Sequence, residues 1–191
     1  MSGIKVHTVC DGSILRQGRA ILEAHSSCTL VIGERMIVVD TSDHNYRPRV
    51  IDGMKRLGID PSQVDILVNT HLHSDHCANN DLFPNAKMVA HQLERPGPSY
   101  WAMAGEELRL MDGVRAVHTP GHCPGAISVF VDSDVRVAMA GDAIPTIDNY
   151  RKMAPPGVTS DPEQAMDSMR RILAWAQVVV PGHDRPFKVD D

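Results

Sequence analysis

Aromatic residues and cysteines are scarce in this sequence of 191 residues. With only 2 Trp, 3 Tyr and 3 Phe, a core must be built mainly from Val, Ile, Leu, Met and Ala. The 4 cysteines are scattered and form no C-x-x-C pair, which excludes a disulfide-rich scaffold and predicts reduced thiols. This composition is typical of sheets flanked by helices.

Long apolar runs and an excess of basic charge are also missing. No segment approaches the roughly 18 apolar residues of a membrane span, and the N-terminus shows no apolar leader segment. A formal net charge of -5 gives no broad positive field that would attract a phosphate backbone. We therefore expect a cytoplasmic protein with no membrane contact, for which nucleic acid is a disfavoured partner.

The order of apolar segments and turn signals predicts an α/β fold in a single domain over residues 1–191, without internal repeats. Strands are predicted over residues 28–32, 36–39, 64–68, 87–90, 114–117, 126–131, 135–140 and 178–180, the first two as a hairpin. Helices are predicted over 48–57 and over 160–173, the latter with Ser160 and Glu163 in capping-box spacing. Segments 95–105 and 143–159 are predicted loops.

One short segment, Thr70 to Cys77, crowds three histidines and an aspartate together just after a predicted strand. On an extended segment His71, His73 and Asp75 would point the same way, with His76 turning in beside them. Imidazole and carboxylate are the usual nitrogen and oxygen ligands of zinc. The spacing therefore indicates a metal site, with a surface histidine cluster as the alternative.

Three more residues of ligand type follow predicted strands or Pro-Gly turns later in the chain. They are His122 in Thr-Pro-Gly-His-Cys-Pro-Gly, Asp142 in Met-Ala-Gly-Asp, and His183 in Val-Pro-Gly-His. Each turn alone is ordinary chemistry, but sharp bends at these positions would bring the side chains to a common edge. The occurrence of all these residues in this order is what distinguishes a metal site from ordinary turns.

This ordered set resembles the metallo-β-lactamase superfamily over nearly the whole chain, in its glyoxalase II and lactonase branches. The resemblance implies a four-layer αββα sandwich. It also implies a role for Asp40, which resembles a strand-end aspartate that braces the metal site. The implied ligands are His71, His73 and His122 for one metal, Asp75, His76 and His183 for a second, and Asp142 as the bridge.

The sequence departs from the family pattern in two loops and in length. Asp40-Thr41-Ser42 stands where the family often has Asp-Thr-Gly, and Cys77-Ala78-Asn79 where it has Gly-Asn. The C-terminal helical region of glyoxalase II has no counterpart in the eight residues after His183 (191 minus 183). We therefore expect a substrate other than a glutathione thioester.

The implied chemistry is hydrolysis of a small molecule. Two Zn²⁺ ions, with iron or manganese as alternatives, would lie about 3.5 to 4 Å apart and share a water that becomes a bridging hydroxide nucleophile. An ester, thioester or lactone is the expected substrate. Asp75 is the candidate catalytic residue, because it could also pass the proton to the leaving group.

Other functions remain open at this point. They are a mononuclear iron enzyme similar to persulfide dioxygenases, a metal-dependent phosphodiesterase or ribonuclease, and a metal-binding module without catalysis. Loop residues that could contact substrate are Arg16, Arg19, Tyr100, Trp101, Tyr150, Arg151 and Lys152, and His44 is a candidate proton relay. The Trp101 loop could equally be a subunit contact in a homo-oligomer.

Overall fold

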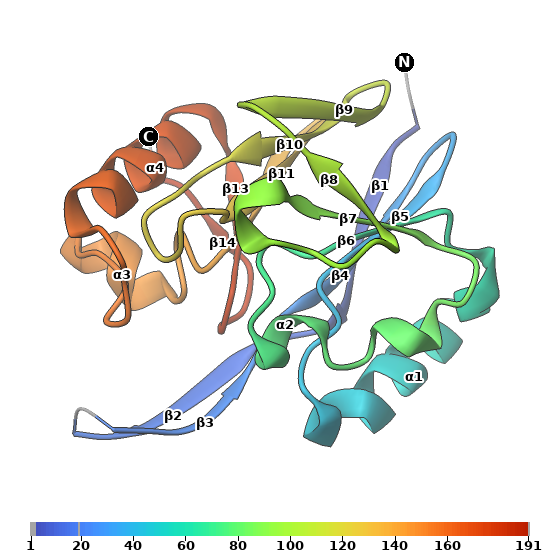
Figure 1. Cartoon of the computed structure of the whole chain (residues 1–191), viewed down its shortest axis with the longest axis horizontal. Coiled ribbons are helices and arrows are strands. Elements are labelled where there is room, and N and C mark those ends of the chain that lie inside the picture. Colours follow the sequence, from blue (N-terminus) through green and yellow to red (C-terminus); the bar gives the residue numbers. More distant parts are fainter. Residues whose placement is uncertain (1–2, 19, 191) are drawn as a thin grey trace.

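Two six-stranded sheets form the body of the molecule (Figure 1). The computed structural model describes residues 3–18 and 20–190. The first sheet contains, in spatial order, β1 (Lys5–Cys10), β4 (Cys28–Ile32), β5 (Met36–Val39), β6 (Ile66–Val68), β7 (Lys87–His91) and β8 (Tyr100–Met103). Strands β5 to β8 are parallel, so β5 and β6 end at the same edge.

The second sheet is mixed in the same way. Its spatial order is β14 (Phe187–Lys188), β13 (Val178–Pro181), β12 (Arg136–Gly141), β11 (Ile127–Asp132), β10 (Val114–His118) and β9 (Glu107–Met111). Here β12 and β13 form the parallel pair, and the other neighbours are antiparallel. Loops that follow parallel strands in both sheets can therefore meet.

Helices cover the outer face of each sheet. The helices are α1 (Arg47–Arg56), α2 (Ser74–Cys77), α3 (Ile147–Lys152) and α4 (Pro162–Trp175), with single 3₁₀ turns at His44–Tyr46, Pro61–Gln63, Asn80–Leu82 and Gln92–Glu94. Helix α1 buries Val50 and Met54 against the first sheet, and α4 buries Met169 and Ile172 against the second. The apolar spacing within each helix produces these one-sided contacts.

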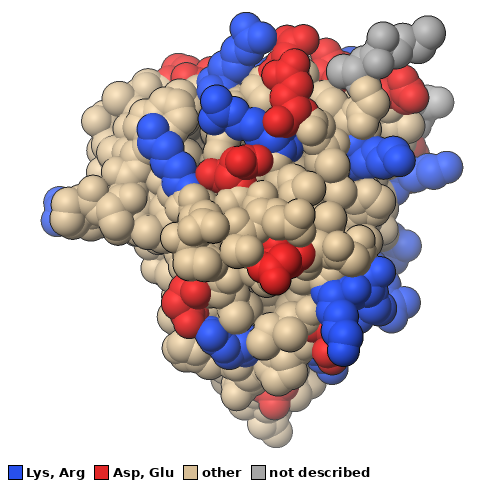
Figure 2. Space-filling view, turned by 90° about the vertical axis from the view of Figure 1, so that its right-hand side faces the viewer, with Lys and Arg blue, Asp and Glu red and all other residues tan. Residues whose placement is uncertain are grey.

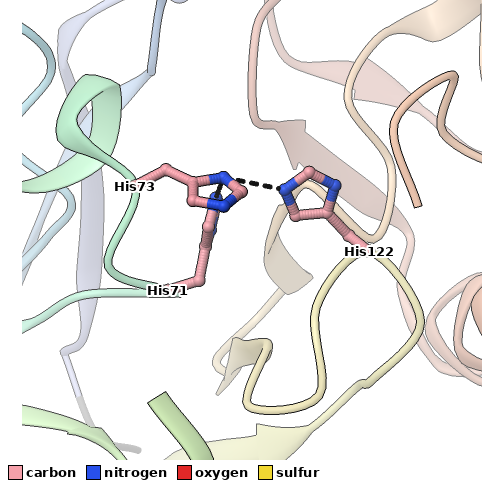
Figure 3. Close-up of side chains that lie close together, drawn as sticks. All are labelled: His71, His73 and His122. Carbon is pink, nitrogen blue, oxygen red and sulfur yellow. Dashed lines mark hydrogen bonds between the residues drawn. The ribbon is translucent and has the colours of Figure 1, made fainter. Parts of the chain in front are cut away.

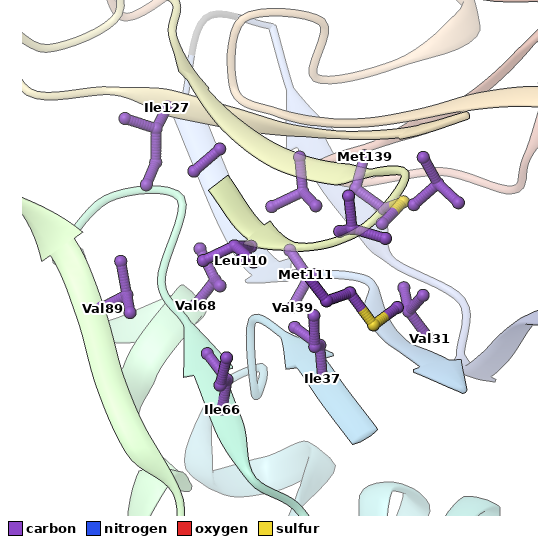
Figure 4. Packing of buried hydrophobic residues seen from close by; sticks show 14 of the residues in the cluster. Val31, Ile37, Val39, Ile66, Val68, Val89, Leu110, Met111, Ile127 and Met139 are labelled. Carbon is purple, nitrogen blue, oxygen red and sulfur yellow. The ribbon is translucent and has the colours of Figure 1, made fainter. Parts of the chain in front are cut away.

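The core between the two sheets is aliphatic, as the scarcity of aromatic residues predicts. Val39 and Val68 from the first sheet pack against Met139 and Ile127 from the second (Figure 4). Together with the two outer clusters under α1 and α4, this inter-sheet cluster gives four layers, helix, sheet, sheet and helix. The predicted αββα architecture is confirmed.

A two-stranded hairpin, β2 (Ser13–Gln17) with β3 (Ala20–His25), belongs to neither large sheet and projects from the body in Figure 1. The sequence did not predict it, nor β1, β8, β9, β14 and α3. The predicted capping box at Ser160 is also wrong. Asp161 caps α4 instead, because its carboxylate accepts from Glu163 N and Gln164 N.

The molecular face shown in Figure 2 carries charges of both signs, and several basic side chains lie together at its lower right with acidic ones nearby. Among the described residues, no helix combines the length and the apolar character needed to cross a membrane.

Candidate metal centre

The first four candidate ligands lie where β6 ends and α2 begins. His71 and His76 are fully buried, and His73 is the residue that precedes the helix, with an extended backbone. Asp75 lies in the first turn of α2. The expectation that Asp75 continues an extended segment is therefore wrong, but the helical turn still directs Asp75 and His76 towards the same region as His71 and His73.

The other three candidates arrive from the second sheet. His122 lies between β10 and β11, Asp142 directly follows β12, and His183 follows β13; all three are buried. The Pro-Gly turn before His183 has a steric reason, because a Cβ on Gly182 would collide with the Asp142 carboxylate. Glycine at this position thus allows two ligands from neighbouring strands to approach each other.

The seven side chains form two adjoining groups. In the first, His73 Nδ1 lies 3.0 Å from His71 Nε2 and 3.1 Å from His122 Nε2 (Figure 3). In the second, Asp75, His76 and His183 place their ligand atoms within 4.8 Å of one another. The structure thus brings together all seven residues that the sequence analysis selected.

Asp142 lies between the two groups. Its Oδ2 is 3.5 Å from His122 Nε2, and its Oδ1 is 3.2 Å from His183 Nε2 and 3.4 Å from His76 Nε2. One carboxylate oxygen therefore faces each group, as a bridging ligand would.

Backbone carbonyls fix the proton positions of His122 and His183. His122 Nδ1 lies 2.7 Å from Val158 O, and His183 Nδ1 lies 3.1 Å from His25 O. A carbonyl oxygen only accepts, so Nδ1 must donate in both rings. In the neutral imidazole the lone pair then lies on Nε2, which is the nitrogen that faces Asp142.

Asp40 and Thr70 orient two more rings. His76 Nδ1 donates to Asp40 Oδ2 at 2.8 Å, which is the bracing role expected of Asp40. The Thr70 hydroxyl donates to the same oxygen at 2.7 Å and therefore accepts from His71 Nδ1 at 3.2 Å. His71 and His76 thus also direct Nε2 into the centre.

This arrangement fits divalent cations. Neutral imidazole rings oriented in this way point their nitrogen lone pairs at one another. A single N–H on His73 Nδ1 can donate to only one of the two nitrogens that it faces, His71 Nε2 and His122 Nε2. In addition, Asp142 Oδ1 is buried and has no hydrogen-bond partner. A buried carboxylate oxygen among lone pairs is unfavourable unless a cation lies between them.

The pKa shifts of two histidines agree with this role. Burial, followed by the neighbouring His76, lowers the pKa of His71 well below its usual value. Burial and His122 also lower the pKa of His73. Both rings are therefore neutral near pH 7, which is the form that binds a metal.

In the second group, charged neighbours determine the pKa shifts of His76 and Asp142. Burial alone would lower the pKa of His76, but Asp40 and Asp142 outweigh it and raise that pKa well above its usual value. Burial alone would raise the pKa of Asp142, but His183 and His76 outweigh it and hold the pKa well below the usual range. The group thus attracts positive charge, and a proton and a metal ion compete for His76 Nε2.

Glu94 joins the two loops that carry the first group, a contact that the sequence did not predict. Its Oε2 accepts from Leu72 N at 3.0 Å, between His71 and His73, and its Oε1 accepts from Gly125 N at 3.1 Å. A Cβ on Gly125 would lie 2.7 Å from Glu94, so glycine there permits the contact. Glu94 therefore fixes the distance between the loop of His71 and the loop of His122.

The cysteines beside the ligands are not among the residues that converge on the centre. Cys77 donates its thiol to His73 O at 3.3 Å, and burial, followed by Glu94, raises the pKa of the Cys123 thiol. All four cysteines are free thiols, as predicted. These contacts favour structural roles for Cys77 and Cys123.

A cavity of about 100 Å³ opens onto the centre. His73, Asp75, His122, Asp142 and His183 form its polar floor. Its remaining lining comes from hairpin β2–β3 and from the loops around Pro145 and Val158, and consists of Ile14, Arg16, Ile21, Ala24, Pro145, Pro156, Gly157 and Val158.

Of the predicted substrate-contacting loop residues that the structure describes, only Arg16 lines this cavity. Tyr100 instead donates to Asn69, Trp101 lies over Lys87, and Tyr150 stacks on Phe187. The remaining candidates lie elsewhere. Lys152 borders a neighbouring cavity, Arg151 and His44 are exposed away from the centre's lining, and Arg19 lies outside the described residues.

Comparisons with known proteins agree with the fold and the site. The family model of the Metallo-beta-lactamase superfamily matches residues 22–115, which include the first four candidate ligands. Metallo-beta-lactamase domain-containing protein 1 of Xenopus laevis is 32% identical over 198 residues, covering 96% of this chain and 81% of that protein.

Matches to N-acyl homoserine lactone hydrolases are more distant. N-acyl homoserine lactonase of Bacillus thuringiensis is 27% identical over 157 residues, covering 71% of this chain and 62% of that protein. The crystal structure of a quorum-quenching N-acyl homoserine lactone hydrolase has a TM-score of 0.76 at 22% identity, covering 96% of this chain and 93% of that one, which shows the shared fold. The chain belongs to the metallo-beta-lactamase superfamily.

Proposed function

We propose that this metal-dependent hydrolase binds two Zn²⁺ ions and hydrolyses an ester, thioester or lactone. The observation that carries the proposal is the position of Asp142, with one oxygen facing His122 and the other facing His76 and His183. His71, His73 and His122 would hold one ion, Asp75, His76 and His183 the other, and Asp142 both.

Bound divalent ions would lower the pKa of water and would polarise a carbonyl oxygen, so no nucleophilic side chain would be required. The protein's own residues hold the geometry. The N–H donors on His76, His122 and His183 are fixed by Asp40 and by backbone carbonyls, which keeps each ring from turning away.

We propose that Asp75 is the carboxylate that moves a proton. About a quarter of its side chain (26%) is exposed, it lines the cavity, and its Oδ2 lies 3.6 Å from His183 Nε2. We assign to the Asp75 carboxylate the transfer of a proton from the attacking water to the leaving oxygen or sulfur.

The residues of the cavity wall favour the proposal that the substrate carries an acyl chain. Ile14, Ile21 and Val158 present aliphatic surface beside the polar floor. Apolar surface of this kind binds the hydrocarbon part of an ester or lactone and excludes water from the reacting carbonyl.

Metal analysis and a substrate panel test the proposal. Protein purified without added metal should contain two zinc ions per chain and should turn over members of a panel of esters, thioesters and lactones. One iron per chain with oxygen consumption on a persulfide would instead establish a dioxygenase. Cleavage of phosphodiesters or short RNA alone would establish a phosphoesterase.

A substitution provides the second test. Asp142→Ala should lose both bound metal and activity, whereas Asp112→Ala, at an exposed aspartate paired with Arg109, should lose neither. Unchanged turnover in Asp142→Ala would refute a mechanism that depends on the bridging carboxylate.

A further inference from the structure

Hairpin β2–β3 turns one of its two faces towards the cavity. Ile14 pairs with Ala24 across the two strands, and Arg16 pairs with Ile21. Paired residues lie on the same face of an antiparallel ribbon, and all four of these residues line the cavity above the metal centre. The inward face is thus aliphatic except for the one guanidinium.

A register irregularity between Leu15 and Arg16 sets this arrangement. Leu15 pairs with Glu23 and Arg16 with Ile21, so Leu22 is the extra residue. Leu15 and Leu22 are exposed, with 52% and 55% of their surface accessible. The bulge therefore places Ile21 opposite Arg16 and keeps the arginine over the cavity.

Among the described residues, Arg16 is the only lysine or arginine that lines the cavity, and none of them forms an ion pair with it. The two carboxylates in the cavity lining, Asp75 and Asp142, belong to the proposed ligand set. Nearby Asp148 is already paired with Lys152 Nζ at 2.8 Å.

Asp184, which lines the neighbouring cavity together with Arg16 and Asp148, also has hydrogen-bond partners. It accepts from Ile147 N at 3.2 Å and from Arg185 N at 2.8 Å. Among the residues that the structure describes, no carboxylate at either cavity therefore forms an ion pair with Arg16.

Gly157 lies on the cavity wall opposite Arg16 and leaves room for its guanidinium. A Cβ added at Gly157 would lie 3.1 Å from Arg16 Nη1, closer than side chains normally approach. Ile14, Arg16 and Gly157 also border a second cavity of about 480 Å³, so the guanidinium lies where the two cavities adjoin. A substrate that reacts at the metal centre and extends outwards passes this point.

We propose that Arg16 selects substrates that carry an oxyanion, a carboxylate or a phosphate, on the part remote from the reacting carbonyl. The proposal rests on the proposed hydrolase function. A guanidinium offers parallel N–H donors that match the two oxygens of such a group. Its place in an otherwise aliphatic wall would make the acidic end of the substrate point away from the metal centre.

Matched esters test the selection. We would compare para-nitrophenyl hexanoate, mono-para-nitrophenyl adipate and a chain-matched ester that ends in a phosphate, using the zinc-loaded full chain. The ratio of kcat/KM for an acidic ester to that for the neutral ester should fall about tenfold in Arg16→Gln, as expected for loss of a charge-assisted hydrogen bond. Arg16→Lys should retain part of the ratio.

Arg151→Gln is the matched control, since Arg151 is an exposed arginine outside both cavities. Its ratio should equal that of the unmodified chain. The acidic ester with the larger Arg16-dependent ratio identifies the oxyanion as carboxylate or phosphate. Equal ratios in Arg16→Gln and the unmodified chain would overturn the proposal.

Direct binding separates this proposal from the proposed function. Calorimetry with adipate and hexanoate on the zinc-loaded protein should show that Arg16→Gln weakens adipate binding about tenfold more than hexanoate binding. If no ester, thioester or lactone is turned over, the proposed function is wrong, and this comparison still decides the role of Arg16. Equal effects on both ligands would refute it.

Discussion

At the scale of single residues, Asp40 controls the centre without being one of the proposed ligands. It has φ +54°, in the left-handed region, and its carboxylate accepts from Thr70 N, from the Thr70 hydroxyl and from His76 Nδ1. One carboxylate thus determines the orientation of His76 directly and of His71 through Thr70.

Replacing Asp40 by Asn tests this control. Asparagine tolerates the left-handed backbone, but its amide NH₂ must face either the Thr70 donors or His76. We expect metal affinity to fall about 10- to 100-fold, as for other losses of a group that orients a ligand. Competition with a chromogenic chelator measures the change, and Asp112→Asn is the control. Equal affinities would show that Asp40 has only a folding role.

Ser42 offers a stability test at the position where the family often has glycine. Ser42 has φ +61°, which costs a non-glycine residue about 1 to 2 kcal/mol. Its buried hydroxyl has no hydrogen-bond partner, which costs about another 1 to 3 kcal/mol. The added backbone entropy of glycine in the unfolded chain opposes these gains by only about 0.5 to 1 kcal/mol.

Ser42→Gly should therefore stabilise the fold by about 1 kcal/mol or more, and raise the melting temperature by roughly 2 to 4 °C per kcal/mol for a chain of this size. Ser42→Ala separates the two causes, because it removes the hydroxyl but keeps the Cβ. Calorimetric melting of all three proteins checks the order Gly, Ala, Ser. A melting temperature of Ser42→Gly below that of the unmodified chain would contradict the prediction.

At the scale of elements, the short turn after β7 connects two ligand loops through Glu94. A Gln at this position can accept only one of the two hydrogen bonds from Leu72 N and Gly125 N, because its NH₂ group is a donor. In Glu94→Gln we expect metal affinity to fall about tenfold. Affinity is measured by chelator competition, beside the melting temperature of the metal-free protein.

Glu107→Gln is the control for Glu94, since Glu107 is an exposed glutamate that pairs with Arg171. A drop in melting temperature alone, with unchanged metal affinity, would show that Glu94 stabilises the fold without positioning the ligands.

Strands with continuous apolar runs could be predicted from the sequence, whereas β1, β8, β9, β14 and the hairpin β2–β3 beside the site could not. The hairpin of β4 and β5 follows from two apolar runs around Gly33. Hairpin β2–β3 was missed because its inward positions, including Ile14 and Arg16, face a cavity lined partly by charge. An element without a core-facing stripe lacks the periodicity on which prediction depends.

At the scale of the whole molecule, the centre joins two halves of the chain. His71, His73, Asp75 and His76 come from the first sheet and its helix α2, while His122, Asp142 and His183 come from the second. Bound metal ions would therefore link both layers of the sandwich.

Metal removal should lower stability. A ligand at about 100 times its dissociation constant stabilises the native state by about 2.7 kcal/mol, so chelation should lower the melting temperature by about 5 to 10 °C. Scanning calorimetry with and without a chelator measures the shift, and added zinc should reverse it. In Asp142→Ala the shift should be much smaller. A melting temperature that is insensitive to chelation in the unmodified chain would contradict the prediction.

The seven candidate ligands could be selected from the sequence because their side-chain types and order are visible there. Their supporting partners could not. His122 depends on the carbonyl of Val158 and His183 on that of His25, and any residue supplies a carbonyl. Only the folded chain shows which backbone oxygen lies beside which imidazole.

The base of hairpin β2–β3 makes hydrogen bonds to residues of the metal centre, whereas the described residues of its distal part make none. His25 O holds His183, and Ser26 N donates to Asp75 O at 3.1 Å. Beyond this base, Arg16 and Ile21 line the cavity, and among the described residues neither makes a hydrogen bond to the groups that orient the imidazoles. Evolution or engineering could thus exchange the ribbon's distal residues to retarget the enzyme to new compounds while its reactive apparatus stays intact.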